Sequence, residues 1–104
     1  MILVEGWVRL APGEIDRLRG AAVEMMRATK AAEPGCLEYA YAVDLADPDL
    51  LRIVERWTDQ AALDAHFATP HMAAFNDAMA GAKILGASVK AYTGDAVRTL
   101  IGAD

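Results

Sequence analysis

The sequence predicts an α+β fold in which a four-stranded antiparallel sheet carries its helices in the order β-α-β-β-α-β. Three observations lead to this prediction. Residues 2–10 alternate as a strand does, residues 14–32 place apolar side chains three and four positions apart as a helix does, and a turn at 46–49 joins two further strand-like segments. This order of elements is the split βαβ arrangement of ferredoxin-like domains.

The first predicted strand, residues 2–10, has apolar side chains on both of its faces. Leu3 and Trp7 are the large residues of one face, and Val4 and Val8 fill the other. An antiparallel sheet with one solvated face alternates more cleanly between apolar and polar residues. Helices cover only one side of such a sheet, so we expect a second copy of the same sheet to cover the other side.

A helix and a hairpin follow the first strand. The helical pattern over residues 14–32 ends at Glu33-Pro34-Gly35, where glycine offers the positive φ that is common past a helix end. Residues 36–44 and 50–57 are the second and third strands. The segment Ala46-Asp47-Pro48-Asp49 is the turn between them.

The segment 51–79 runs from the third strand into two short helices and carries both histidines. We expect the first helix to begin near Thr58 and to stop at Thr69-Pro70, because proline lacks an N–H but fits the first position of a new helix. Thr69 is the predicted N-cap of that new helix. A linker at 81–86 then leads to a fourth strand at 87–93, and the apolar tail at 96–101 could extend the edge of a partner's sheet.

Composition narrows the classes of partner. The 104 residues, 55% of them hydrophobic, are predicted to form one domain, 1–104, with one small core. The net charge is −5 and the basic residues are scattered, so we expect no nucleic-acid partner. No segment approaches the roughly 20 apolar residues of a membrane span, and no basic segment typical of a signal peptide precedes the first strand. A single cysteine, Cys36, is compatible with a reducing cytosol. Together these features lead us to expect a cytoplasmic protein without membrane partners.

Two histidines and an asparagine are the candidate reactive groups. His66 shares an apolar helix face with Leu63 and Phe67, and His71 opens the next helix, where Asn76 lies on an otherwise apolar face. Such histidines are commonly hydrogen-bonded core residues, but histidine is also the side chain that transfers protons near neutral pH. The spacing of the two histidines differs from H-E-x-x-H, and we expect no cysteine or carboxylate cluster nearby to complete a ligand set, so no metal site is predicted.

Large apolar side chains surround these groups in the predicted fold. Trp7 and Trp57 are core residues by default, and the methionines are packing residues whose flexible thioethers also suit a pocket for flat rings. Glu55 alternates with Trp57 along the third strand and would need a partner if it were buried. We expect Arg9 or Arg56, from this or a second subunit, to form a structural salt bridge with it.

Short motifs between residues 33 and 71 resemble those of one known family, and the resemblance covers nearly the whole chain. They are Glu33-Pro34-Gly35-Cys36-Leu37, Glu55-Arg56-Trp57, Ala62-Leu63, His66 and Thr69-Pro70-His71. In this order and spacing they resemble the antibiotic biosynthesis monooxygenase family of small dimeric proteins. The resemblance implies a ferredoxin-like domain whose sheet packs against that of a second copy, which makes a dimeric α/β barrel.

The resemblance also implies a cofactor-independent monooxygenase that acts with molecular oxygen on a small aromatic quinol-like or anthrone-like substrate. No phosphate-binding loop and no serine-hydrolase motif points to another chemistry. We expect His66 to act as the general base and Asn76 or Tyr39 to hold the ring oxygen. The predicted substrate-binding residues are Trp7, Trp57, Phe67, His71, Met72, Phe75 and Met79.

Two alternatives stay open. The first is a non-catalytic dimer of the same fold that binds a small molecule or has a structural role. The second, a haem-degrading monooxygenase, is implied by other relatives in which an asparagine lies on the first strand and a tryptophan stands at the position of His66. In this sequence the first strand offers Glu5 or Trp7 instead, and Asn76 lies near the position where those relatives place a histidine.

Overall fold

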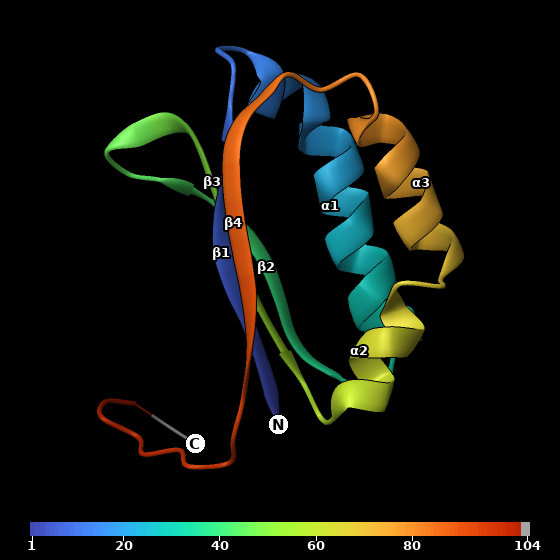
Figure 1. Ribbon diagram of the computed structural model, residues 1–104, viewed down its shortest axis with the longest axis vertical. Helices are drawn as coiled ribbons and strands as arrows, with labels where there is room; N and C mark the ends of the chain where they lie inside the picture. The colour runs from blue at the N-terminus through green and yellow to red at the C-terminus, as the bar shows by residue number, and fades with distance from the viewer. Residues whose placement is uncertain (103–104) are drawn as a thin grey trace.

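The computed structural model describes residues 1–102, and in it three helices lie on one face of a four-stranded antiparallel sheet (Figure 1). The strands, in the spatial order β2-β3-β1-β4, are β1 (Ile2–Leu10), β2 (Cys36–Asp44), β3 (Asp47–Trp57) and β4 (Ile84–Thr93). The helices are α1 (Glu14–Ala32), α2 (Gln60–His66) and α3 (Pro70–Met79). The predicted ferredoxin-like order of elements is confirmed. Residues 103 and 104 of the predicted domain 1–104 lie outside the described residues.

Two strands begin earlier than the sequence predicts. The segment 46–49 is not all turn, because Asp47 already pairs with Asp44 across the hairpin and β3 begins there. Pro48 fits near the start of a strand, where a missing N–H disturbs the ladder least. β4 likewise begins at Ile84, since the chain pairs with Leu10 of β1 before the predicted linker ends.

The sheet face beneath the helices carries the core. The register places Trp57 opposite Ile2 and Glu55 opposite Val4, and Tyr39 of β2 faces Glu55 from the other side. Residues opposite one another in an antiparallel pair share a face. The buried cluster built on these strands consists of Ile2, Val4, Met25, Tyr39, Trp57 and Leu63.

The other sheet face, here called the outer face, lies away from the helices (Figure 1). It presents apolar side chains that are partly open to solvent, with Trp7 36% exposed, Val54 42% and Tyr92 47%. Charged residues alternate with them, and Arg52 pairs in register with Trp7. Apolar residues therefore occupy both sheet faces, as the alternation of the first strand predicts.

Two side chains define the turn between α2 and α3. Asp59 is the N-cap of α2 and accepts a hydrogen bond from the Ala62 amide at 2.8 Å, so the helix begins after Asp59 and not at Thr58. Thr69 is the N-cap of α3, as predicted, and its Oγ1 accepts from the Met72 amide at 3.2 Å. The same hydroxyl donates to the His66 carbonyl at 2.8 Å. These bonds satisfy backbone groups that a helix end leaves unpaired.

α3 is the most weakly anchored element of the helical layer. It contributes partly buried side chains to the interior, but no residue of Pro70–Met79 is fully buried. α1, by contrast, buries Leu18, Met25 and Thr29.

No helix among residues 1–102 is both long enough and apolar enough to cross a membrane.

The chain after β4 is exposed and forms no regular element up to residue 102. Val97 is 70% exposed and Ile101 is 95% exposed. Near the start of this tail, Asp95 accepts a hydrogen bond from the N-terminal ammonium group at 2.7 Å. That ion pair joins the start of β1 to the chain just after β4. The predicted pairing of the tail with a partner's sheet stays a prediction.

Substitutions at two glycines, one in β1 and one in α1, test how closely β1 and β4 approach each other. A Cβ at Gly6 would lie 2.2 Å from the Ser88 carbonyl oxygen, whereas a Cβ at Gly20 in α1 would meet nothing within 4 Å. We predict that Gly6→Ala lowers the free energy of unfolding by about 2 kcal/mol, as overpacking does. Gly20→Ala should raise it by about 0.5–1 kcal/mol. Urea denaturation measures both, and equal midpoints for Gly6→Ala and wild type would contradict the strand spacing.

Candidate functional site

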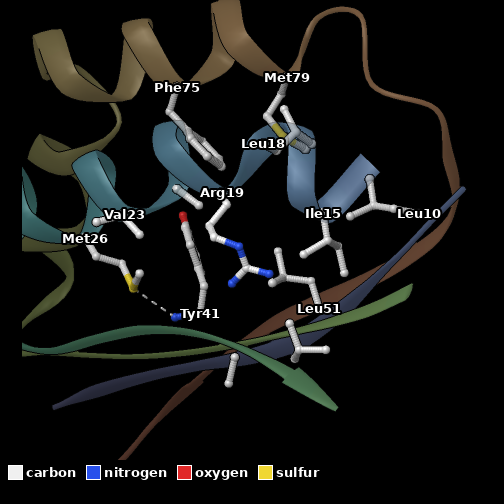
Figure 2. A pocket seen from close by; sticks show the side chains of 13 residues that line it. Leu10, Ile15, Leu18, Arg19, Val23, Met26, Tyr41, Leu51, Phe75 and Met79 are labelled. Atoms are coloured by element: carbon white, nitrogen blue, oxygen red, sulfur yellow. Dashed lines mark hydrogen bonds between the residues drawn. The ribbon is translucent and has the colours of Figure 1, made fainter. Parts of the chain in front are cut away.

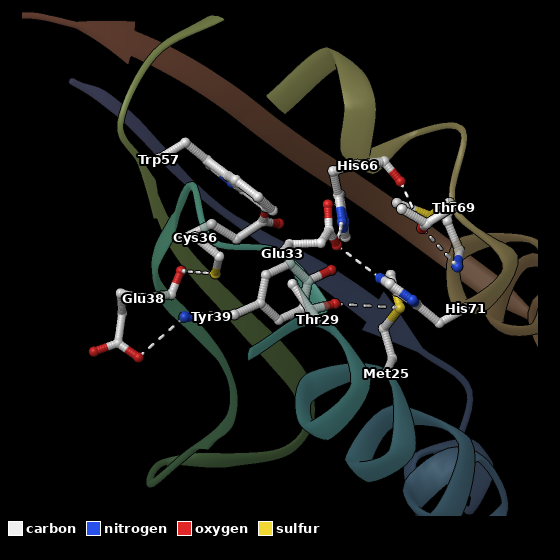
Figure 3. A network of polar contacts seen from close by, with 12 residues as sticks. Met25, Thr29, Glu33, Cys36, Glu38, Tyr39, Trp57, His66, Thr69 and His71 are labelled. Carbon is white, nitrogen blue, oxygen red and sulfur yellow. Dashed lines mark hydrogen bonds and ion pairs between the residues drawn. The ribbon is translucent and has the colours of Figure 1, made fainter. Parts of the chain in front are cut away.

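Two histidines from different helices bind the same carboxylate oxygen (Figure 3). Oε2 of Glu33 lies 2.6 Å from Nδ1 of His66 and 2.7 Å from Nε2 of His71. Glu33 is the C-cap of α1, His66 ends α2 and His71 is the second residue of α3. The turn between α2 and α3 at Thr69-Pro70 directs His71 toward Glu33. Three helix ends therefore meet at one oxygen atom.

The carboxylate fixes the orientation of the His66 ring. A carboxylate only accepts hydrogen bonds, so Nδ1 of His66 carries the hydrogen, and in the neutral imidazole Nε2 is left as the acceptor. The side chain is 1% exposed. Within the described residues, Nε2 of His66 is a buried side-chain atom without a hydrogen-bond partner. Buried polar atoms are nearly always satisfied, and this nitrogen is therefore free for a bound molecule.

A pocket of about 200 Å³ lies beside the His66 ring. We call it the His66 pocket, and its lining residues are Val4, Glu55, Leu63, His66, Phe67, Met72, Val89, Lys90 and Ala91. It exists because the helices cover chiefly β2 and leave the inner face of β4 partly open. Since Nδ1 of His66 faces Glu33, Nε2 lies on the opposite side of the ring. The pocket thus combines a mainly apolar lining with the imidazole of His66, whose Nε2 has no partner among the described residues.

Glu55 is a second polar group in this pocket. It is 8% exposed, and its Oε1 accepts a hydrogen bond from Nε1 of Trp57 at 3.0 Å. Burial raises the pKa of Glu55 above its ordinary value, although the Trp57 hydrogen bond and nearby His66 act in the opposite direction. Burial thus makes the Glu55 carboxyl easier to protonate than an exposed glutamate.

The predicted arginine partner of Glu55 is absent from its side of the sheet within residues 1–102. Arg9 and Arg56 occupy strand positions that alternate with the inner face, so both side chains leave the sheet on the outer side. Arg9 pairs with Asp47 at 2.5 Å, and Arg56 lies 4.0 Å from Glu38. Within one chain, the expected structural salt bridge is wrong because strand alternation separates its members.

Aromatic rings enclose the His66 imidazole. Ring centroids of Trp57, Tyr39 and Phe67 lie 4.8, 5.2 and 5.9 Å from that of His66. The Tyr39 hydroxyl is hydrogen-bonded to the Tyr41 hydroxyl at 2.7 Å. Burial raises the pKa of Tyr41 to about 12 and that of Tyr39 above its usual range, so both phenols stay protonated at neutral pH.

A separate apolar cavity of about 140 Å³ lies between α1, α3 and the sheet (Figure 2). We call it the helix cavity, and its lining includes Ile15, Leu18, Met26, Tyr41, Phe75 and Met79. Phe75 stacks on Tyr41 with centroids 5.7 Å apart. The Tyr41 amide donates to the Met26 sulfur at 3.3 Å. Tyr39 links the two spaces, since its ring touches His66 and its hydroxyl reaches Tyr41.

The structure divides the predicted site residues among several places. His66, Phe67 and Met72 line the His66 pocket, and Phe75 and Met79 line the helix cavity. Tyr39 and Trp57 are fully buried beside His66, and His71 reaches the site through Glu33.

Asn76 and Trp7 do not join these groups within the chain. The inward stripe of α3 is formed by Met72, Phe75 and Met79, and Asn76 falls at its edge and is exposed. The expectation that Asn76 faces inward is wrong for that reason. Trp7 lies on the outer face, because its position alternates with Val4 and Val8, and it cannot clamp a ring beside His66 of the same subunit.

Glu33 and Glu55 are the site residues that sequence reasoning missed. From the sequence, Glu33 is interpreted as part of the signal that ends α1, and Glu55 as the acidic member of a structural salt bridge. One physical signal pointed to Glu33, since a negative charge at a helix C-terminus is unfavourable in the helix dipole. An acid at that position therefore indicates another reason for its presence.

The same three side chains could serve as metal ligands. Glu33, His66 and His71 each offer one donor atom, and these atoms lie within 4.8 Å of one another. Metal bonds of about 2.0–2.2 Å at tetrahedral angles would hold donor atoms about 3.4 Å apart. The two nitrogen–oxygen separations of 2.6 and 2.7 Å are those of hydrogen bonds. The geometry thus favours a hydrogen-bonded cluster.

Comparisons with known proteins agree with this fold. A model of the family described as "Antibiotic biosynthesis monooxygenase" matches residues 1–78. An Escherichia coli K12 protein named "Probable quinol monooxygenase YgiN" is 34% identical over 92 residues, which cover 78% of this chain and 86% of that protein. An uncharacterised Synechocystis protein is 26% identical over 91 residues, and the match spans 88% of this chain but 61% of that protein.

Solved structures show the same likeness. A Deinococcus radiodurans crystal structure named for the same family superposes with a TM-score of 0.86 at 26% identity, covering 98% of this chain and 100% of that one. A second crystal structure, named as an antibiotic biosynthesis monooxygenase, has a TM-score of 0.81 at 32% identity over 94% of this chain and 100% of that one.

Replacing the carboxylate of Glu33 tests how much it contributes to stability. We predict that Glu33→Leu lowers the free energy of unfolding by about 2 kcal/mol or more, because two imidazole N–H groups lose their acceptor. Glu33→Gln should lose less, since an amide oxygen can still accept both bonds. Glu24→Leu, which removes an exposed carboxylate from α1, is the matched control and should change stability by less than about 0.5 kcal/mol. Similar urea midpoints for Glu33→Leu and Glu24→Leu would refute the cluster.

Proposed function

Because the chain belongs to the antibiotic biosynthesis monooxygenase family, we propose that it is a cofactor-independent monooxygenase acting on a small aromatic quinol-like or anthrone-like substrate. The unpartnered, buried Nε2 of His66 is the observation that carries the proposal. The relative named "Probable quinol monooxygenase YgiN" supports this substrate class.

His66 acts as the general base in this proposal. Nε2 takes a proton from the substrate, and the Glu33 carboxylate stabilises the imidazolium through Nδ1. The resulting substrate anion is electron-rich and itself reduces molecular oxygen. For an anthrone, the reacting carbon loses two hydrogens and gains one oxygen atom, while the second oxygen atom leaves as water. The protein supplies a base, a fixed position and a site with little water.

The size and the lining of the His66 pocket suit a compact ring. Its volume of about 200 Å³ lies below the range of about 300–1,000 Å³ typical of pockets for drug-sized ligands. Trp57 stands beside His66 on the interior side, while Phe67 is 61% exposed and stands at the rim. Met72 adds a flexible thioether that adapts to flat rings. Tyr39 packs against the His66 imidazole but does not line the His66 pocket.

One observation favours the alternative of a non-catalytic binding protein. The helix cavity is apolar, and the polar side chains of its lining are Arg19 and the protonated Tyr41. A molecule held there would meet no proton acceptor comparable to Nε2 of His66. Oxygen uptake separates the two functions, because a binding protein would take up ligand without consuming oxygen.

We further propose a homodimer in which the outer faces of two copies pack together. Trp7, Val54 and Tyr92 supply apolar contacts there, and such a patch is a common sign of a protein interface. In such a dimer the outer-face arginines lie near the boundary between subunits. We also propose a cytoplasmic location, with which the single cysteine, Cys36, is compatible.

Substitution of His66 tests the proposed reaction. We predict that His66→Ala lowers oxygen uptake with a panel of quinols by about 10²-fold or more, the usual contribution of a general base. His71→Ala removes the other imidazole but leaves Nε2 and the Glu33 contact of His66, so most of the activity should remain. Unchanged turnover in His66→Ala would remove His66 from the mechanism.

A charge on the outer face tests the dimer. The wild-type chain should sediment at twice its mass of 11.1 kDa, and Val54→Asp should sediment as a monomer because a buried, unpaired carboxylate is costly at an interface. Val23→Asp is the matched control, since Val23 is an exposed residue of α1. A wild-type monomer, or a dimer that tolerates Val54→Asp, would contradict this assembly.

A further inference from the structure

A buried carboxyl group lines the same pocket as the His66 imidazole. Glu55 lies on β3 at 8% exposure, and both residues line the His66 pocket. The Trp57 indole lies against His66 and also donates its N–H to Glu55. Two polar side chains thus border one apolar space, and they are held there by a shared aromatic neighbour.

Glu55 has no cationic partner among the described residues. No lysine or arginine forms an ion pair with it, and Lys90, which borders the pocket from β4, is exposed. The titratable groups around Glu55 are His66 from α2, Glu33 from the end of α1, and Tyr39 and Cys36 from β2. A buried carboxyl group without a cationic partner is more stable in its neutral form than an exposed one is, because burial disfavours the charged form.

When Glu55 is protonated, the hydrogen bond from Trp57 decides which oxygen carries the proton. Oε1 of Glu55 accepts the indole N–H, so it has the role of the carbonyl oxygen of the acid. The hydroxyl is then on Oε2, where it is free to donate. His66 offers the complementary group, an acceptor nitrogen whose other side is held by Glu33.

We propose that Glu55 is a substrate-recognition residue whose carboxyl donates a hydrogen bond to one oxygen of the bound ring while His66 accepts the proton of another group. This inference rests on the proposed function, because it concerns the same pocket. It narrows the substrate class to a ring with two separated functional groups, one that gives a proton and one oxygen that accepts. In an anthrone the acceptor is the carbonyl, and in a quinol it is the second ring oxygen, on which negative charge develops.

Anaerobic binding tests this role apart from turnover. The probes are naphthohydroquinone and its one-oxygen analogue naphthol, titrated without oxygen and followed by tryptophan fluorescence. The wild-type protein should bind naphthohydroquinone about tenfold more tightly than naphthol, the effect of one additional net hydrogen bond. Glu55→Leu should lose this preference and still bind naphthol like the wild type.

Glu55→Gln separates a hydrogen-bond donor from a charge. The amide oxygen of glutamine can accept from Trp57, which turns the amide NH₂ toward the pocket as a donor. This variant should therefore keep most of the preference for naphthohydroquinone. Glu24→Leu on the surface of α1 is the control for loss of a carboxylate and should bind both probes unchanged.

Several outcomes would overturn the inference. They are a wild-type protein that binds both probes equally or neither of them, a Glu55→Leu variant that keeps the preference, and a Glu55→Gln variant that loses it fully. Oxygen uptake in air decides the proposed function separately. If Glu55 governs the binding preference but no oxygen is consumed, recognition stands and the monooxygenase proposal fails.

Discussion

The carboxylate of Glu33 is the interaction on which the candidate site depends. It joins the end of α1 to His66 of α2 and His71 of α3, so the relative positions of three helices converge on one oxygen atom. Charged acceptors form hydrogen bonds roughly twice as strong as neutral ones. Because the contact occupies Nδ1 of His66, it also decides which nitrogen is left for chemistry. The orientation of the reactive group is therefore a consequence of how the helices pack.

A local feature of the chain makes this convergence possible. The Thr69 hydroxyl caps α3 and at the same time holds the last carbonyl of α2, so the two helices meet at a fixed angle. Without the break, a continuous helix would turn the side chains five positions apart to opposite sides. The capped turn instead brings both imidazoles to the same acceptor. The unfavourable placement of an acid at the end of α1 is offset by these bonds.

Much of this architecture is readable from the sequence, because local patterns decide it. The bounds of β1, α1 and β2 follow from alternation, helical periodicity and the Pro-Gly stop, and the Thr69 cap follows from a threonine before a proline. The site is less readable, since it joins residues 33 and 38 positions apart. Asn76 shows the limit of periodicity, because a residue at the edge of an apolar stripe faces inward or outward depending on what packs above it. For Glu55, alternation gave the face correctly and also puts the neighbouring Arg56 on the other side. Only for Arg9, which lies on β1, is the register between the strands needed.

The shallow seating of α3 has a consequence for how a molecule reaches the interior. This helix covers the helix cavity through Phe75 and Met79 and borders the His66 pocket through Met72, yet none of its residues is fully buried. Segments with little buried surface separate from a fold at the lowest free energy. We therefore expect α3 to separate from the fold more readily than α1 does. An opening that left its capped first turn in place would expose both spaces and keep the contacts of Glu33.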